Sequence, residues 1–224
     1  MCGRFGLTRS PAKIAEKLGA TYDEAGFQPH YNVAPTQPIL AAINDDERTV
    51  SALRWGLVPW WSEGPKSMKL TTFNARIETI ATSRVYREAL EKRRCAIFAD
   101  GYFEWHKELD GSKTPVWIYR KDEQPFVFAG LWETWRSRET NERLRSCTII
   151  TQPPNEFAER IHSRMPVVLD VDEARAWLEP GKGKPADLLE ILAPSPAALW
   201  TAHDVDRRVG NFRYDDPGLI AELP

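Results

Sequence analysis

The sequence predicts an α+β fold: a single domain with a mainly antiparallel β-sheet or barrel surrounded by short helices. Two observations carry this prediction. Segments rich in aromatic and β-branched residues, which favour strands, are mixed with short helical segments and lack the regular βαβ order of a parallel sheet. The chain has 224 residues, the length of one large domain, and 42% of them are apolar, which is enough to build a core.

The first half of the chain begins with a helix and continues into a hairpin. Residues 10–19 form a short helix, with Ser10 as its cap, proline in the first turn and glycine at the end. The segment 22–38 is rich in Pro, Asn and Gln and is predicted to be a loop. Strands over 39–43 and 49–55 pair around a polar turn. An irregular stretch then extends to residue 73, and 84–93 is predicted to be a helix.

The second half contributes most of the sheet. Strands are predicted over 95–105, 114–120, 126–132 and 144–151. Short helices follow over 155–162, 172–178 and 185–192, the second of them with a capping box formed by Asp170 and Glu173. We expect one domain over 1–224, with the proline-rich tail after about residue 180 at its periphery.

Composition excludes several classes of protein. Thirty basic and 32 acidic residues give a net charge of −2, which excludes coating of nucleic acid by bulk charge but leaves room for a local basic groove. No apolar run approaches the roughly 20 residues that span a bilayer. Three scattered cysteines indicate a reducing cytoplasm rather than a disulfide framework or a zinc knuckle. With no histidine pair at metal-ligand spacing and no phosphate-binding glycine loop, we expect no metal and no cofactor.

The N-terminus places an unusual pair of nucleophiles together. The chain begins Met1-Cys2-Gly3-Arg4 without a signal-peptide pattern, and the small Cys2 side chain predicts removal of Met1. A terminal Cys2 would offer an α-amine of pKa about 7.7–8.0 beside a thiol of pKa about 8.5. Such a pair can attack an amide with the thiol. It can also condense with an aldehyde through the amine, after which the thiol closes a five-membered thiazolidine ring. Composition alone would make Cys2 a packing residue.

Three further segments are polar where a core would be apolar. Asn74 and Arg76 share one face if their segment is extended. Glu104 lies between aromatic residues, where burial would raise its pKa and suit it to proton transfer. His162 ends a short helix ahead of Arg164. Each has a plain structural alternative: Arg76 pairs with Glu78, Glu104 is an exposed strand residue, and His162 meets the helix dipole.

Basic and aromatic residues gather in the middle of the chain. Residues 66–94 hold eight basic side chains, Lys69 among them, and three acidic ones, next to Trp55, Trp60 and Trp61. Cations beside exposed rings are what single-stranded nucleic acid requires, because phosphates meet the cations and bases stack on the rings. An equally good interpretation is that the tryptophans form core and the basic run is a solvated helix face.

Taken together, these segments resemble the SOS-response-associated peptidase (SRAP) family. The matching motifs run along nearly the whole chain in the expected order: MCGRF at 1–5, YNVAPT at 31–36, RWGLVP at 54–59, NARIET at 74–79, DGYFEW at 100–105, FAGLWE at 128–133 and HSRMP at 162–166. The resemblance implies a sensor of abasic sites in single-stranded DNA. It would crosslink through Cys2 to the sugar aldehyde as a thiazolidine, with lyase-like chemistry and peptidase-like removal of the segment before the cysteine.

The same resemblance assigns roles to the polar segments. Glu104 would move protons at the sugar and the amine, His162 would act at the departing sugar oxygen, and Asn74 would hold the sugar or the Cys2 backbone. Flanking phosphates would meet Arg4 and Arg76, with Arg84 and Arg164 as weaker candidates, and stacking or wedge residues would come from Trp55, Trp60 and Trp61. We expect a cytoplasmic monomer, associated with the nucleoid during DNA damage if bacterial, that binds no membrane.

Two other functions stay open at this point. A class II glutamine amidotransferase domain also begins Met-Cys-Gly and uses its cysteine to hydrolyse an amide. This chain lacks a recognisable synthase half and the expected glutamine-pocket pattern. The third possibility is a non-covalent single-strand binder in which Cys2 is inert.

Overall fold

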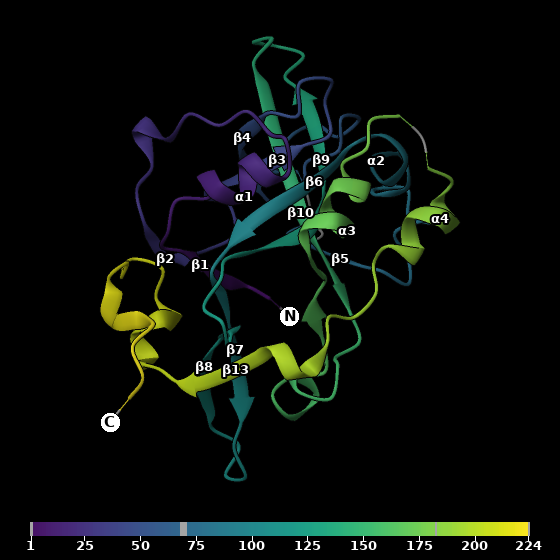
Figure 1. The fold of residues 1–224 in the computed structure, drawn as a ribbon. Helices are drawn as coiled ribbons and strands as arrows, with labels where there is room; N and C mark the ends of the chain where they lie inside the picture. Colours follow the sequence, from purple (N-terminus) through teal and green to yellow (C-terminus); the bar gives the residue numbers. More distant parts are fainter. Residues whose placement is uncertain (1, 68–70, 182, 224) are drawn as a thin grey trace.

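Figure 1 shows the computed structural model, which describes residues 2–67, 71–181 and 183–223. A barrel occupies the upper half of the view, and strands β7, β8 and β13 lie below it, with the start of the described chain between the two. No helix of the described part is long and apolar enough to cross a membrane. The predicted α+β fold with a mainly antiparallel sheet or barrel is confirmed.

The barrel is a closed ring of strands. β10 pairs in parallel with β4 and antiparallel with β9, and the antiparallel pairs β4–β3, β3–β6 and β6–β9 complete the ring. Closure leaves no open edge between these strands. Their bounds are β3 Pro38–Ile43, β4 Val50–Trp55, β6 Arg94–Ala99, β9 Phe126–Arg136 and β10 Arg143–Gln152. Short strands β5 Asn74–Arg76, β11 Met165–Pro166 and β12 Val168–Leu169 pair with β10 or β9.

The second sheet is antiparallel and has the order β13-β8-β7-β1-β2. It consists of β1 Arg4–Leu7, β2 His30–Val33, β7 Gly101–Lys107, β8 Lys113–Arg120 and β13 Trp200–Asp204. The last of these strands pairs with β8 along its whole length, and Trp200 is buried. The tail after residue 180 is thus partly built into the sheet rather than lying entirely at the periphery.

One strand expectation is corrected at Asp100. The sequence predicts a single strand over 95–105, but β6 belongs to the barrel and β7 to the second sheet. The break occurs because Asp100 accepts hydrogen bonds from the Thr8 hydroxyl at 2.8 Å and the Arg9 N–H at 2.9 Å, which turn the backbone away from the barrel. Glu104 is carried to the second sheet by this change of sheet.

The helices are short, as predicted, and their ends differ by a few residues. They are α1 Ala12–Lys17, α2 Arg87–Lys92, α3 Val171–Trp177 and α4 Pro185–Glu190. The capping box of Asp170 and Glu173 is confirmed. The helix predicted over 155–162 is wrong: only the 3-10 turn η2, Ala158–Arg160, forms there. Gln152 pairs with Met165, so the chain must reverse within this segment, and a longer helix would carry it away from the sheet.

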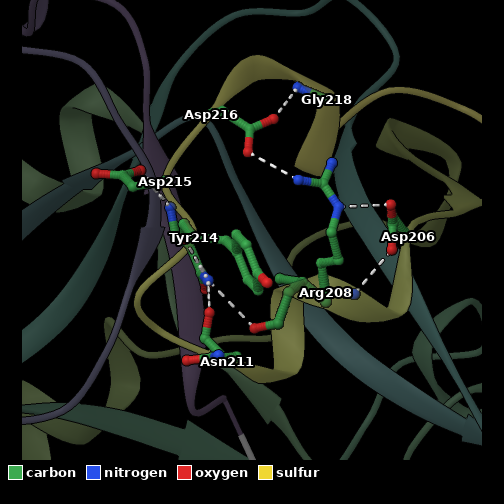
Figure 2. A network of polar contacts seen from close by, with 9 residues as sticks. Asp206, Arg208, Asn211, Tyr214, Asp215, Asp216 and Gly218 are labelled. Carbon is green, nitrogen blue, oxygen red and sulfur yellow. Dashed lines mark hydrogen bonds and ion pairs between the residues drawn. The ribbon is translucent and has the colours of Figure 1, made fainter.

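The loop predicted over 22–38 is also corrected. It contains the 3-10 turn η1, Glu24–Gly26, and the edge strand β2. Its polar side chains hid this strand, because they bind a distant part of the chain. Asn32 is buried and donates to the carbonyls of Val209, Asn211 and Tyr214, at 3.2, 3.2 and 2.9 Å. We call residues 204–220 the C-terminal hook; Figure 2 shows its polar contacts around Arg208 and Asp216.

Aromatic rings join the barrel to the second sheet. Phe5 of β1 packs edge-on against Trp55 of β4 at 5.2 Å and Phe128 of β9 at 5.7 Å between ring centroids. Tyr102 of β7 contacts Phe128 of the barrel in the same way at 6.1 Å, and within the second sheet it packs against Trp200 of β13 at 6.2 Å. Edge-to-face pairs contribute about 0.5–1.5 kcal/mol each beyond their buried area. The excess of tryptophan in the composition is therefore used largely in packing.

Candidate functional site

Cys2 lies two residues before the start of β1 and is fully buried, at 0% exposure. Burial raises the pKa of its thiol well above the usual value, and the negative charge of Glu104 raises it further. The thiol is therefore held in its neutral form at neutral pH. Its Sγ contacts the Arg4 carbonyl at 3.9 Å. Met1, whose removal the sequence predicts, lies outside the described residues.

Asn74 holds the backbone of Cys2. Its Nδ2 donates to the Cys2 carbonyl at 2.7 Å, one of the two roles that the sequence suggested for it. Pairing of β5 with β10 sets this position, with Asn74 opposite Ile149. Ala75 is buried between half-buried Asn74 and exposed Arg76, as expected if the two polar residues share a face. The buried Oδ1 of Asn74 has no hydrogen-bond partner among the described residues, so it can still accept a hydrogen bond from a ligand.

Glu104 is a buried carboxyl, only 2% exposed, on β7. The alternative of an ordinary exposed strand residue is therefore excluded. Burial raises the pKa of this carboxyl, while the charge of a protonated His162 opposes the rise. A carboxyl with a raised pKa exchanges protons closer to neutrality, which suits it to act as a general acid or base.

His162 follows η2 and turns one nitrogen toward Glu104. Its Nε2 lies 4.0 Å from Glu104 Oε2, and its side chain is 30% exposed. The Arg164 backbone N–H donates to Nδ1 at 3.0 Å. Since Nδ1 accepts this bond, the proton of the neutral ring sits on Nε2, on the side of Glu104. We call Cys2, Asn74, Glu104 and His162 the cysteine pocket.

Tyr102 is a neighbour of this pocket that sequence reasoning missed. Burial raises the pKa of its phenol well above the usual value, and the charges of Cys2 and Glu104 raise it further. The signal was present: Tyr102 and Glu104 are two residues apart on one strand, so their side chains share a face.

Of the predicted phosphate ligands, Arg4 and Arg76 remain available. Arg4 lies at the start of β1 and donates to the carbonyls of Gly3 and Gly210, at 2.9 and 3.4 Å. The second contact ties it to the C-terminal hook. Arg76 is exposed at the end of β5, the same short strand that carries Asn74.

Arg164 is placed in a different role from the one predicted. It forms a two-pronged ion pair with Glu78 and also donates to the Thr151 carbonyl at 2.7 Å. This hydrogen bonding lowers the pKa of Glu78. Glu78 thus pairs with Arg164, which corrects the alternative that Arg76 is its partner. Arg164 braces the loop that carries His162 and is only 15% exposed, so it is poorly placed to bind phosphate.

The three tryptophans separate into core and surface. Trp55 is fully buried, and its indole N–H donates to the Phe73 carbonyl at 2.8 Å, so it cannot stack on a base. Trp60 is 57% exposed and donates to Glu88 at 3.2 Å. Trp61 is half-buried, with the exposed Arg84 guanidinium 4.5 Å from its ring centroid. Of the predicted stacking residues, Trp60 and Trp61 therefore remain accessible, and Arg84 adds a cation beside Trp61.

The basic run over 66–94 does not form one surface. Arg94 is 1% exposed and donates to main-chain carbonyls, including Trp177 at 2.7 Å. Arg93 pairs with Glu133 at 2.8 Å. Lys69 lies outside the described residues. In the described part of the chain, no cluster of three His, Cys, Asp or Glu side chains could hold a metal ion.

Comparisons with known proteins find relatives that match nearly the whole chain. The family model described as SOS response associated peptidase (SRAP) matches residues 1–212. Abasic site processing protein YoqW of Bacillus subtilis is 39% identical over 223 residues, covering 98% of this chain and 99% of that protein. Abasic site processing protein YedK of Escherichia coli is 34% identical over 229 residues, with 98% and 99% covered. Abasic site processing protein HMCES of Xenopus tropicalis is 31% identical over 268 residues, with 100% and 78% covered.

A solved structure extends the likeness to three dimensions. The crystal structure of a protein from Bacteroides thetaiotaomicron superposes with a TM-score of 0.88 at 26% identity, and 100% of each chain is covered. Matches of this extent, in a chain whose quoted motifs meet around one buried cysteine, establish that this protein belongs to the SOS response associated peptidase (SRAP) family.

Proposed function

We propose that the protein captures abasic sites in single-stranded DNA by a covalent bond through Cys2, after removal of Met1. The observation that carries this proposal is the cysteine pocket itself: Cys2 with its backbone held by Asn74, beside a buried carboxyl and a histidine. The relatives named abasic site processing proteins support the substrate class.

The first step is attack of the Cys2 α-amine on the aldehyde carbon of the ring-opened sugar. A C–N bond forms, one water leaves, and an imine results. The amine has an ordinary pKa of about 7.7–8.0, so part of it is neutral at pH 7. The buried Cys2 thiol is protonated there, because its pKa is raised. The amine is therefore the first nucleophile, and the thiol follows.

The second step closes the ring. The thiol sulfur adds to the imine carbon, its proton passes to the nitrogen, and a thiazolidine forms without further loss of atoms. Glu104 accepts and returns the protons of both steps, and His162 serves the sugar oxygen that departs when the sugar ring opens. Asn74 keeps Cys2 in place while its amine and its thiol react in turn.

Ring closure also decides the fate of the DNA strand. An imine at the sugar carbon acidifies the adjacent C–H, and loss of that proton would expel the 3′ phosphate and break the strand, which is lyase chemistry. Closure of the thiazolidine removes the imine and so protects the strand. A variant that keeps an amine but lacks the thiol, Cys2→Ala, should therefore convert crosslinking into strand cleavage.

Recognition of the strand uses the surface around the pocket. Arg4 and the exposed Arg76 bind the flanking phosphates, while Trp60 and Trp61 stack on bases or wedge between them. Stacking is sequence-tolerant and contributes about 1–3 kcal/mol per base. A wedge would also explain a preference for single strands, because an intact duplex must be unstacked at a cost of a few kcal/mol.

Exposure of the amine requires cleavage before Cys2, which fits a peptidase-like activity of the same pocket. The Cys2 thiol would attack the preceding carbonyl, Glu104 would pass the proton to the leaving amine, and water would release the methionine. Intact mass spectrometry of Glu104→Gln tests this step. Autoproteolysis is supported if Glu104→Gln retains Met1 while the wild type loses it. If both the variant and the wild type lose Met1, the cleavage is assigned to a cellular aminopeptidase.

A denaturing gel tests the proposed function. Wild-type protein is incubated with a single strand that carries one abasic site, and we expect a band that survives detergent and heat. Cys2→Ala should lose the band, and Cys147→Ala, which removes another buried thiol, should keep it. A band that persists in Cys2→Ala would overturn the mechanism. Glutamine hydrolysis by the wild type would favour the amidotransferase alternative, and salt-sensitive binding without a band would favour a non-covalent binder.

A further inference from the structure

Two neighbouring hollows begin beside the segment that precedes Asn74. The first, of about 190 Å³, is lined in part by Phe73, which precedes Asn74, and by Thr36 and Arg54. The second, of about 540 Å³, shares Thr36 and Arg54 with the first and adds Arg143 and Arg145. Because two lining residues are common to both, the hollows form one path from the side of Asn74 to these arginines.

Strand β10 gives this path a direction and a scale. Ile149 of β10 lies beside Asn74, and Arg145 precedes it by four residues along the same strand. At about 3.3 Å per residue, Arg145 is about 13 Å from the level of Asn74. Arg143 lies two residues further out, as the first residue of β10. Figure 1 shows the β9–β10 hairpin rising above the barrel.

The far end of the path is strongly positive. None of its described lining residues is acidic, and Arg54, Arg143 and Arg145 form no ion pair with any described carboxylate. Arg143 stands directly opposite Arg136 of β9 in the strand register. Like charges in directly opposed positions are destabilising, so this arrangement favours an anion between or beside them.

The arginines are oriented by contacts that leave their charge unneutralised. Arg54 donates to the Gly56 carbonyl at 2.7 Å, and partial burial lowers the pKa of its guanidinium. Arg145 donates to the Ser51 hydroxyl at 3.3 Å, and its guanidinium lies 5.8 Å from the ring centroid of Trp132. These neutral partners hold the guanidinium groups in place and keep their remaining N–H donors available.

We infer that Arg54, Arg143 and Arg145 form a second DNA-contact site, which binds the backbone phosphates of the strand where it continues beyond the captured sugar. The occupant is a polyanion with regularly spaced phosphates, because the cations are spread along a path instead of converging on one point. This inference rests on the proposed function, which brings a DNA strand to the near end of the path.

The test compares strand lengths in reversible binding. Intact single strands, which carry no aldehyde, are titrated with wild-type protein and with the triple variant Arg54→Gln, Arg143→Gln, Arg145→Gln. The matched control replaces Lys107, Lys113 and Lys121 by Gln. It removes the same charge. Lys107 and Lys113 are a like-charged cross-strand pair of the second sheet, Lys121 directly follows β8, and none of the three lines the path. Thermal unfolding of each variant verifies the fold.

On a long strand, we expect the arginine variant to lose about tenfold in affinity at low salt, and its salt slope to fall by about 2, since each contacted phosphate of a single strand contributes about 0.7. On a strand too short to leave the cysteine pocket, it should match the wild type. The double variant Arg143→Gln, Arg145→Gln retains the Arg54–Gly56 contact. Its salt slope should fall by about two-thirds as much as that of the triple variant, because two of the three phosphate contacts are removed.

Three results would overturn the inference: wild-type binding of long strands by the arginine variant, an equal loss on short strands, or an equal loss in the lysine control. Failure of the proposed function is seen separately. The wild type would then give no covalent band with an abasic strand, whereas the length-dependent binding of intact strands would still report on the arginine path.

Discussion

The cysteine pocket and the C-terminal hook are both built from polar side chains, but they differ in their exposure to water. Glu104 in the pocket is buried, and its pKa is raised. The carboxylates of the hook are exposed to half-buried, and hydrogen bonds from Arg208 lower the pKa of Asp206. The network in Figure 2 therefore consists of surface charges that are paired with one another. In the pocket, by contrast, burial disfavours the charged form of the Glu104 carboxyl.

This difference separates chemistry from support. A buried carboxyl with a raised pKa is unfavourable for folding at neutral pH, and such groups gather at functional sites. The hook instead stabilises the fold. Asn32 donates to three carbonyls of the hook, and the buried Val209 and Leu219 of the hook pack in one cluster with Phe103 of β7. Phe103 is the neighbour of Glu104, so the hook supports the strand that carries the reactive carboxyl.

The largest effect is expected from Glu104→Gln. The substitution keeps the shape of the side chain and removes its proton transfer, which contributes about 10²–10⁴-fold in enzymes. Crosslinking, followed over time on denaturing gels, should slow by at least about 100-fold. A Glu133→Gln variant, which alters another buried carboxyl, should crosslink near the wild-type rate. Normal crosslinking by Glu104→Gln would contradict the role given to the pocket.

The pH dependence sharpens the same comparison. As pH falls through the raised pKa of Glu104, the carboxylate is protonated and the base is lost, so the rate should fall at a pH above the ordinary glutamate value of about 4.3. The folded state also binds this proton more tightly than the unfolded state does. The free energy of unfolding therefore decreases as pH rises from the ordinary to the raised pKa. Glu104→Gln should lack the stability trend, and its rate should keep only the decrease that protonation of the Cys2 α-amine causes in both proteins. Wild-type profiles in this variant would show that the carboxyl is not their source.

A smaller loss is expected from His162→Gln. His162 is partly exposed, so water can replace part of its proton transfer, and we expect a rate reduction of about tenfold to 100-fold. His106→Gln is the control, a histidine on β7 beyond Glu104. Single-turnover crosslinking under identical DNA saturation separates the two. Equal rates for both variants would remove His162 from the mechanism.

On the hook side, Asn32→Ala should cost stability and leave the chemistry largely intact. The substitution leaves one buried and two partly buried carbonyls of the hook without their donor, and an unsatisfied buried acceptor costs about 1–3 kcal/mol. Chemical denaturation measures the loss, and crosslinking well below the unfolding midpoint should retain the wild-type rate. A large rate loss in fully folded protein would show that the hook acts on the reaction itself.

The smallest effect is expected from Arg208→Gln. Its ion pairs with Asp206 and Asp216 lie at the surface, where salt screens them. The unfolding temperature should decrease slightly at low salt and match the wild type at high salt. A large decrease that persists in high salt would contradict the view of Figure 2 as a screened surface network.

Much of the fold could be predicted because strand and helix patterns are local. The break between β6 and β7 could not, since both sides of Asp100 look like strand and the hydrogen bonds that turn the chain come from Thr8 and Arg9. Strand β2 was hidden for the same reason: its polar Asn32 is satisfied by carbonyls of a hook far along the chain.

The site residues were found through motifs, but their geometry was not. Nothing local indicates that Asn74 reaches the Cys2 carbonyl or that His162 faces Glu104. The burial of Trp55 could have been predicted, because Leu53 and Trp55 alternate with Ala52 and Arg54 along β4. The capture of Arg164 by Glu78 could not, since it depends on a loop that brings two distant segments together.

The central claim is a thiazolidine at Cys2, and intact mass spectrometry of the wild-type adduct tests it most directly. The predicted mass is that of the chain without Met1 plus the abasic strand minus one water. Borohydride should leave this mass unchanged, because a closed thiazolidine has no imine to reduce. An adduct that retains Met1, that gains two hydrogens on borohydride treatment, or that maps to a lysine would contradict the account.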